Sequence, residues 1–91
     1  MTNTQTFSFL DGVFKTQDAQ YLVMSFYNEK LKFHHRELLA MKLNNDGNMA
    51  ATEARITQLE QARDQFKHFL DSFPGTEKHI ELKGSIEVRV L

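Results

Sequence analysis

The chain has 91 residues, of which 11 are basic and 12 acidic, and it contains no cysteine. This length allows one domain, residues 1–91, with a small core that a partner subunit can extend. The lack of cysteine excludes disulfides and thiol nucleophiles, and a formal charge of −1 gives nucleic acid or anionic lipid no general attraction. Because the sequence shows neither a basic, apolar leader nor an apolar run of membrane-spanning length, we expect a cytoplasmic protein without a membrane segment.

The first fifteen residues carry a weak signal for β-structure. Phe7 and Phe9 alternate with polar residues, and Asp11-Gly12 is a common hairpin turn. We therefore predict a short strand or a short hairpin within residues 1–15.

Two long amphipathic helices are predicted at residues 17–43 and 49–73, separated by a turn at residues 44–48. Thr16 and Asn48 are placed to cap the two helices. A connection this short makes the helices antiparallel, so that residues whose numbers sum to about 92 should face each other.

The second helix has one apolar side. That side is interrupted by Arg63 and consists of Met49, Ala51, Thr52, Ile56, Leu59, Ala62, Phe66, Phe69, Leu70 and Phe73. The repeat of three and four residues is typical of left-handed helix packing. Pro74-Gly75 favours a type II turn directly after the helix.

The first helix differs because it carries two apolar stripes, separated only by Lys30 and Glu37. The stripe that we call the Leu31 stripe consists of Val23, Met24, Tyr27, Leu31, Leu38 and Met41. The Leu22 stripe consists of Leu22, Phe26, Phe33 and Ala40. One stripe can pack on the second helix, which leaves the other for the strands or for a second subunit. The Leu22 stripe is therefore the candidate interaction surface.

After the second helix, the apolar residues alternate with charged ones through residues 79–91. Gly84 lies in phase with the apolar set, so this segment is either one strand or a hairpin with a loop at residues 83–85. We expect it to pack on the first helix and its edge to pair with the N-terminal strand or with another copy. The predicted class is α+β; the alternative is an all-α hairpin that dimerises into a four-helix bundle.

Two groups of polar side chains are weighed as sites. His34 and Glu37 have the helical spacing of half a carboxylate-histidine metal pair, and His35 adjoins them, but no second half is apparent, so no metal or other cofactor is expected. Lys32, His35 and Arg36 form a candidate basic patch, for which a solvated helix face is the simpler interpretation.

No run of residues has the specificity of a catalytic or nucleotide-binding motif, so a non-enzymatic protein is favoured. We expect a protein-protein interaction or structural module that acts as a homodimer, with another protein as a second kind of partner. The alternatives are weak nucleic-acid binding by the basic patch and a small metal protein or enzyme that uses His34, His35 and Glu37. In the favoured interpretation, Leu22, Phe26 and Phe33 are buried against something other than the apolar side of the second helix.

Overall fold

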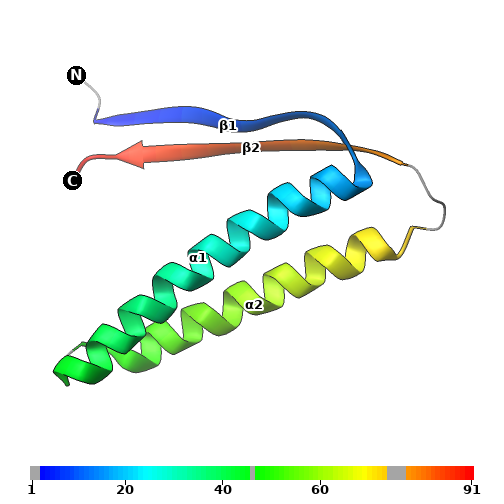
Figure 1. The fold of residues 1–91 in the computed structure, drawn as a ribbon. Coiled ribbons are helices and arrows are strands. Elements are labelled where there is room, and N and C mark those ends of the chain that lie inside the picture. The colour runs from blue at the N-terminus through cyan, green and yellow to red at the C-terminus, as the bar shows by residue number, and fades with distance from the viewer. Residues whose placement is uncertain (1–2, 46, 74–77) are drawn as a thin grey trace. The chain divides into compact units, whose positions relative to one another are not determined.

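The computed structural model describes residues 3–45, 47–73 and 78–91, in which two strands flank two helices along the chain. The elements are β1 (Thr4–Lys15), α1 (Thr16–Asn44), α2 (Met49–Asp71) and β2 (His79–Arg89), as Figure 1 shows. The predicted α+β class with a helical hairpin is confirmed. The all-α alternative is wrong, because β1 and β2 pair as an antiparallel sheet.

The chain divides into two compact units, a strand unit of residues 1–19 and 75–91 and a helical unit of residues 20–74. Backbone pairing joins the two strands of the first unit, and apolar side chains join the two helices of the second. The single domain expected from the chain length stays a prediction.

The turn between the helices has the left-handed backbone that its sequence favours. Asn45 has φ 50° and Gly47 has φ 82°, and asparagine and glycine are the residues that adopt such values at the least cost. The side chain of Asn48 accepts a hydrogen bond from the backbone N–H of Ala51 at 3.1 Å, which confirms it as the cap of α2.

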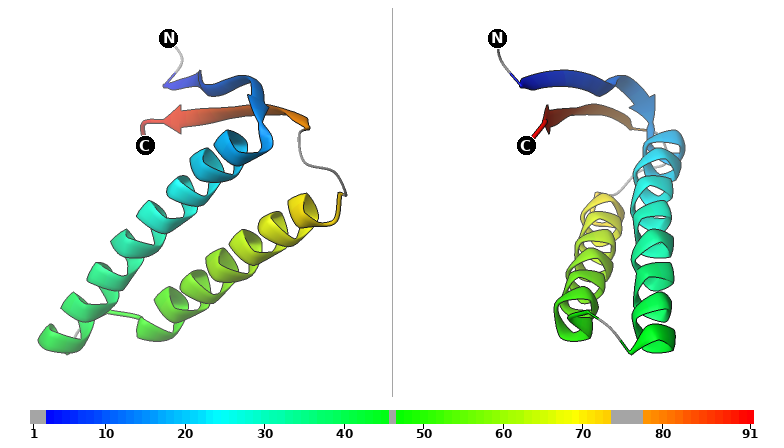
Figure 2. Two further views of the ribbon diagram at one scale, coloured as in Figure 1. Left: turned by 45° about the vertical axis from the view of Figure 1, so that its right-hand side comes forward. Right: turned by 90° about the vertical axis from the view of Figure 1, so that its left-hand side faces the viewer.

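The two helices run antiparallel in the predicted alignment (Figure 2). The hydroxyl of Thr52 donates to the sulfur of Met41 at 3.6 Å, and Nη1 of Arg63 donates to Oδ1 of Asn28 at 3.5 Å. In each pair the residue numbers add to within one of the predicted sum. The length of the turn was therefore sufficient to align the helices.

The core of the helical unit lies between the Leu31 stripe and the apolar side of α2. Leu31 is only 6% exposed and clusters with Ile56 and Leu59, while Tyr27 and Leu38 pack against the cluster. Burial of these side chains stabilises the hairpin by roughly 1.5–3 kcal/mol for each large one. The Leu31 stripe is thus the stripe of α1 that α2 covers.

The ends of the helices differ in detail from the prediction. Thr16 is the first residue of α1, and its hydroxyl donates to the backbone oxygen of Lys78 at 3.1 Å, so it joins the start of α1 to the residue before β2. Helix α2 ends at Asp71, where the backbone N–H of Ser72 donates to the carbonyl of His68 at 3.0 Å. The predicted turn at Pro74-Gly75 lies outside the described residues.

Both strands are continuous through the segments whose sequence also allows a hairpin turn. Asp11 pairs with Lys83 and Gly12 with Leu82, so the hairpin considered for Asp11-Gly12 is wrong and β1 is continuous. The same pairing makes residues 79–89 one strand rather than a hairpin. Each of the two short segments finds its partner in the other, which removes the need for a local turn.

A bulge in β1 places Phe7, Leu10 and Phe14 on one face of the sheet, whereas Val13 pairs with Glu81 on the other face. The register moves from the pair Ser8 and Ser85 to the pair Leu10 and Gly84, which leaves Phe9 as an extra residue. Without this residue, the two halves of β1 would present their apolar side chains on opposite faces. Across the bulge, the face shared with the apolar residues of β2 includes Phe7, Leu10, Phe14, Ile80, Leu82, Ile86 and Val88.

Candidate interaction surface

The Leu22 stripe lies on the side of α1 away from the core cluster. At about 100° per residue, Phe33 lies roughly 160° around the helix from Leu31, which packs on α2. Phe33 is 60% exposed and Phe26 is 47% exposed, Ala40 is exposed, and Leu22 is half-buried. The structure therefore brings the four predicted residues to one face of α1 and leaves the two large rings partly exposed.

Neighbouring aromatic rings orient both phenylalanines. The ring of Phe33 meets that of His34 edge-on, with 5.2 Å between the ring centroids, and the ring of Phe26 meets that of Tyr27 in the same way at 5.9 Å. Edge-to-face pairs of this kind restrict the rings at a modest gain in energy. The exposed apolar surface is consequently held in shape by residues of its own helix.

Charged side chains of both signs flank the Leu22 stripe. The helical repeat places Glu29 and Arg36 along one flank of Phe33, and Lys30 and Glu37 along the other. Glu29 also forms a surface ion pair with Lys32, 3.3 Å between Oε1 and Nζ. Each flank thus carries one acid and one base, an arrangement that reads the same in both directions along the helix.

Several exposed apolar side chains lie outside the Leu22 stripe. Tyr21, Leu39 and Leu43 lie on the side of α1 that also carries Lys32, and Leu39 is 57% exposed. Phe69 and Phe73, predicted to belong to the buried side of α2, are exposed and stack edge-on at 5.0 Å. The apolar side of α2 is wider than the part of it that α1 covers. The sequence pattern shows the width of the apolar side but not how much of it the other helix covers.

The side chains of His34 and Glu37, which have an i, i+3 spacing on α1, contact each other. Nδ1 of His34 lies 3.3 Å from Oε1 of Glu37, and the histidine side chain is mostly buried. His35 is exposed and turns to another side of the helix. Throughout the described ranges, His, Cys, Asp and Glu form no group of three that could hold a metal ion. The contact has the geometry of a helical i, i+3 pair.

The candidate basic patch is exposed but partly neutralised. Lys32, His35 and Arg36 all lie on the surface, and the ammonium group of Lys32 pairs with Glu29 at 3.3 Å. A phosphate-binding patch works by an excess of positive charge. Because Glu29 already neutralises the charge of Lys32, this arrangement resembles an ordinary solvated helix face.

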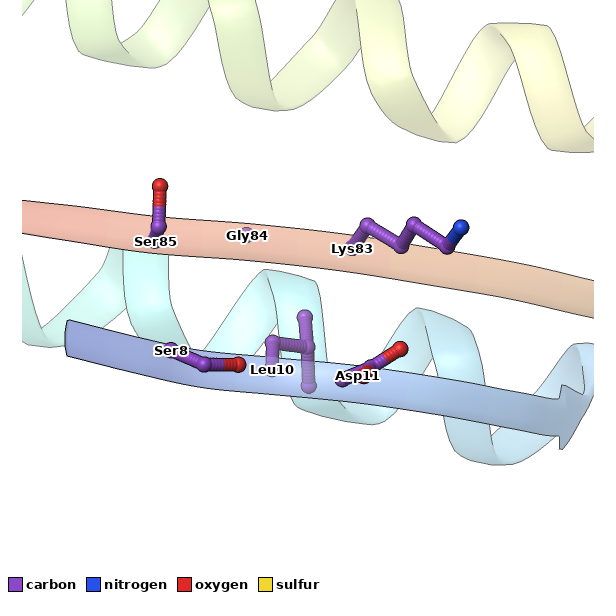
Figure 3. Close-up of a pocket in the computed structure, with 6 residues that line it drawn as sticks. All are labelled: Ser8, Leu10, Asp11, Lys83, Gly84 and Ser85. Carbon is purple, nitrogen blue, oxygen red and sulfur yellow. The ribbon is translucent and has the colours of Figure 1, made fainter. Parts of the chain in front are cut away.

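The bulge in β1 leaves a shallow surface depression of about 390 Å³, shown in Figure 3. Its lining consists of Ser8, Leu10, Asp11, Lys83, Gly84 and Ser85. Lys83 and Ser85 project to the same side of β2, and every polar side chain of the lining is exposed. A catalytic pocket encloses its polar groups and excludes water, which this depression does not do.

Neither helix reaches, over the described residues, the combination of length and apolarity that a bilayer span requires. Comparison with known proteins gives no match: no family model, no curated protein and no solved structure is significantly similar to this chain. A function for this chain is therefore inferred from its own sequence and structure.

Proposed function

We propose that this protein is a non-enzymatic interaction module that associates with a second copy of itself through the Leu22 stripe. The observation that carries the proposal is the exposure of Phe33, a large ring that is 60% exposed in the middle of a long helix whose opposite side is packed. Aromatic side chains at the centre of a patch supply much of the energy of protein interfaces.

The spacing of the stripe fits an antiparallel pair of α1 helices. Phe26 and Ala40 lie one heptad before and one heptad after Phe33. With a two-fold axis beside Phe33, this ring packs on its own counterpart, and Phe26 packs on Ala40 of the second copy. A large ring opposite a small side chain is the complementarity that helix packing favours.

The charges that flank the stripe support the same axis. In an antiparallel pair with two-fold symmetry, the same flank of each helix faces its copy. Glu29 then lies opposite Arg36 of the second copy, and Lys30 lies opposite Glu37. Charged pairs beside an apolar interface influence how two helices are aligned. This arrangement therefore favours the antiparallel dimer centred beside Phe33 over antiparallel dimers shifted along the helix axis.

The small size of the core supports self-association on energetic grounds. Within the described residues, the buried apolar side chains are Ala19, Leu31, Ile56, Leu59 and Leu70. So few buried side chains leave a chain of this size with little stability, and an interface that covers Phe26 and Phe33 adds apolar burial. The absence of cysteine fits a reducing compartment, and we place the dimer in the cytoplasm.

Sedimentation velocity of the unmodified chain across micromolar concentrations tests this proposal. The expected result is reversible association, in which species of at least twice the monomer mass dissociate on dilution. A chain that stays monomeric throughout this range would show that the Leu22 stripe has another purpose.

A further inference from the structure

We infer that the outer edge of β2 is a second self-recognition surface, which pairs antiparallel with β2 of another copy around a two-fold axis at Ser85. Strand β2 has one neighbour, β1, in the two-stranded sheet of the described residues. A strand with one neighbour presents a row of backbone donors and acceptors along its other edge, and such an edge recruits a further strand.

The two strands are unequal as templates for pairing. Strand β1 carries the bulge at Phe9, which interrupts the regular spacing of its backbone groups. Strand β2 contributes no extra residue and keeps strict alternation from Ile80 to Val88. The edge of β2 is therefore the regular one, and a bulge is a known means of blocking a strand edge.

Charge complementarity selects the second copy as the occupant. With the axis at Ser85, Lys83 lies opposite Glu87 of the second copy, and Glu81 lies opposite Arg89. By symmetry each pair occurs twice, and all four side chains are exposed on the polar face of the sheet. Opposite charges directly across two strands stabilise their pairing.

The apolar residues match in the same register. Leu82 falls opposite Val88 of the second copy, and Gly84 falls opposite Ile86. Because directly opposed residues share a face, the apolar face of one sheet continues into the other without a break.

Registers with the two-fold axis at the residue before or after Ser85 are unfavourable. An axis at Gly84 places Glu81 opposite Glu87 of the second copy, and an axis at Ile86 places Lys83 opposite Arg89. Like charges directly across two strands destabilise the pair. The charges of β2 therefore favour the axis at Ser85 over the axes at Gly84 and Ile86.

Cysteine cross-linking tests the register directly, because the chain has no cysteine of its own. The two-fold axis brings both copies of Ser85 opposite each other, with Cα atoms about 4.5–5.5 Å apart, within the range that a disulfide spans. Ser85→Cys should therefore form a disulfide-linked dimer in oxidised glutathione. Ser8→Cys is the matched control, since Ser8 pairs with Ser85 on β1 and would lie about 14 Å, three strand spacings, from its own copy. Lys83→Cys tests the alternative axis at residue 83.

We expect Ser85→Cys to cross-link at least about tenfold faster than either other variant, because the interface raises the effective concentration of its thiols. Glu81→Lys in the Ser85→Cys chain should slow the reaction, and adding Arg89→Glu should restore it. Every variant also carries Phe33→Glu, so that the strand contact is measured in the absence of the helical contact. Equal rates for the three cysteines, faster reaction of Ser8→Cys or Lys83→Cys, or loss of the Ser85→Cys advantage in the Phe33→Glu chain would overturn the inference.

Discussion

The ring of Phe9 covers Gly84 on the neighbouring strand: a Cβ built on Gly84 would lie only 2.9 Å from Cε1 of Phe9. The bulge and the glycine therefore belong together. The extra residue in β1 provides a ring, and the missing side chain in β2 provides the space for it. This contact fixes the register at the point where the two halves of β1 change phase.

Replacing Gly84 by valine should displace the ring of Phe9. We expect Gly84→Val to lower the free energy of unfolding by about 1–3 kcal/mol, as overpacking does elsewhere, despite the higher strand propensity of valine. Urea denaturation at a fixed protein concentration measures this change. Ser8→Val, on the exposed polar face, is the control and should change stability by less than about 0.5 kcal/mol. If the cost of Gly84→Val is unchanged in a Phe9→Ala chain, the ring is not its cause.

The cap of α2 provides a second quantitative test. Asn48→Ala removes the acceptor for the backbone N–H of Ala51 and should lower the free energy of unfolding by about 1 kcal/mol. Asn48→Asp keeps an acceptor at the same place and should retain most of the stability. Thermal unfolding followed by circular dichroism compares the two variants, and an equal loss in both would show that the side-chain acceptor contributes nothing.

The unequal faces of α1 predict opposite outcomes for two leucines on the same helix. Leu31→Ala opens a cavity in the cluster with Ile56 and Leu59, and we expect it to cost about 2–5 kcal/mol of unfolding free energy. Leu43 is 77% exposed, so Leu43→Ala should cost less than about 0.5 kcal/mol. Chemical denaturation measures both, and a similar cost for the two would contradict the placement of α2 on the Leu31 stripe.

The helical part of the fold could be predicted because its signals are local. A turn of five residues determined that the helices are antiparallel and which residues face each other, and the contact of Thr52 with Met41 agrees with that alignment. The cap at Asn48 was likewise readable from one residue beside a helical pattern. The existence of two apolar stripes on α1 followed from the helical repeat alone.

The strands could be predicted only in part, because their pairing joins the two ends of the sequence. Asp11-Gly12 has the sequence of a turn, but these residues pair in the sheet with Lys83 and Leu82, which lie about 70 residues away in the sequence. The bulge at Phe9 has no local signature, since an extra residue is recognised only against the partner strand. The exposure of Leu39 and Phe69 also depends on how wide a strip the facing helix covers, which their own sequence does not contain.

The central claim, that the Leu22 stripe of α1 joins two copies of the chain, is tested most directly by sedimentation equilibrium of a matched pair of variants. Phe33 and Leu39 lie on the same helix with similar exposure, 60% and 57%, but only Phe33 belongs to the stripe. In chains that carry Glu81→Lys to weaken the strand contact, we predict that Phe33→Glu raises the dimer dissociation constant at least about tenfold, or about 1.4 kcal/mol. Leu39→Glu should leave it unchanged, and both variants should stay helical by circular dichroism. Equal dissociation constants for the two variants would contradict the claim.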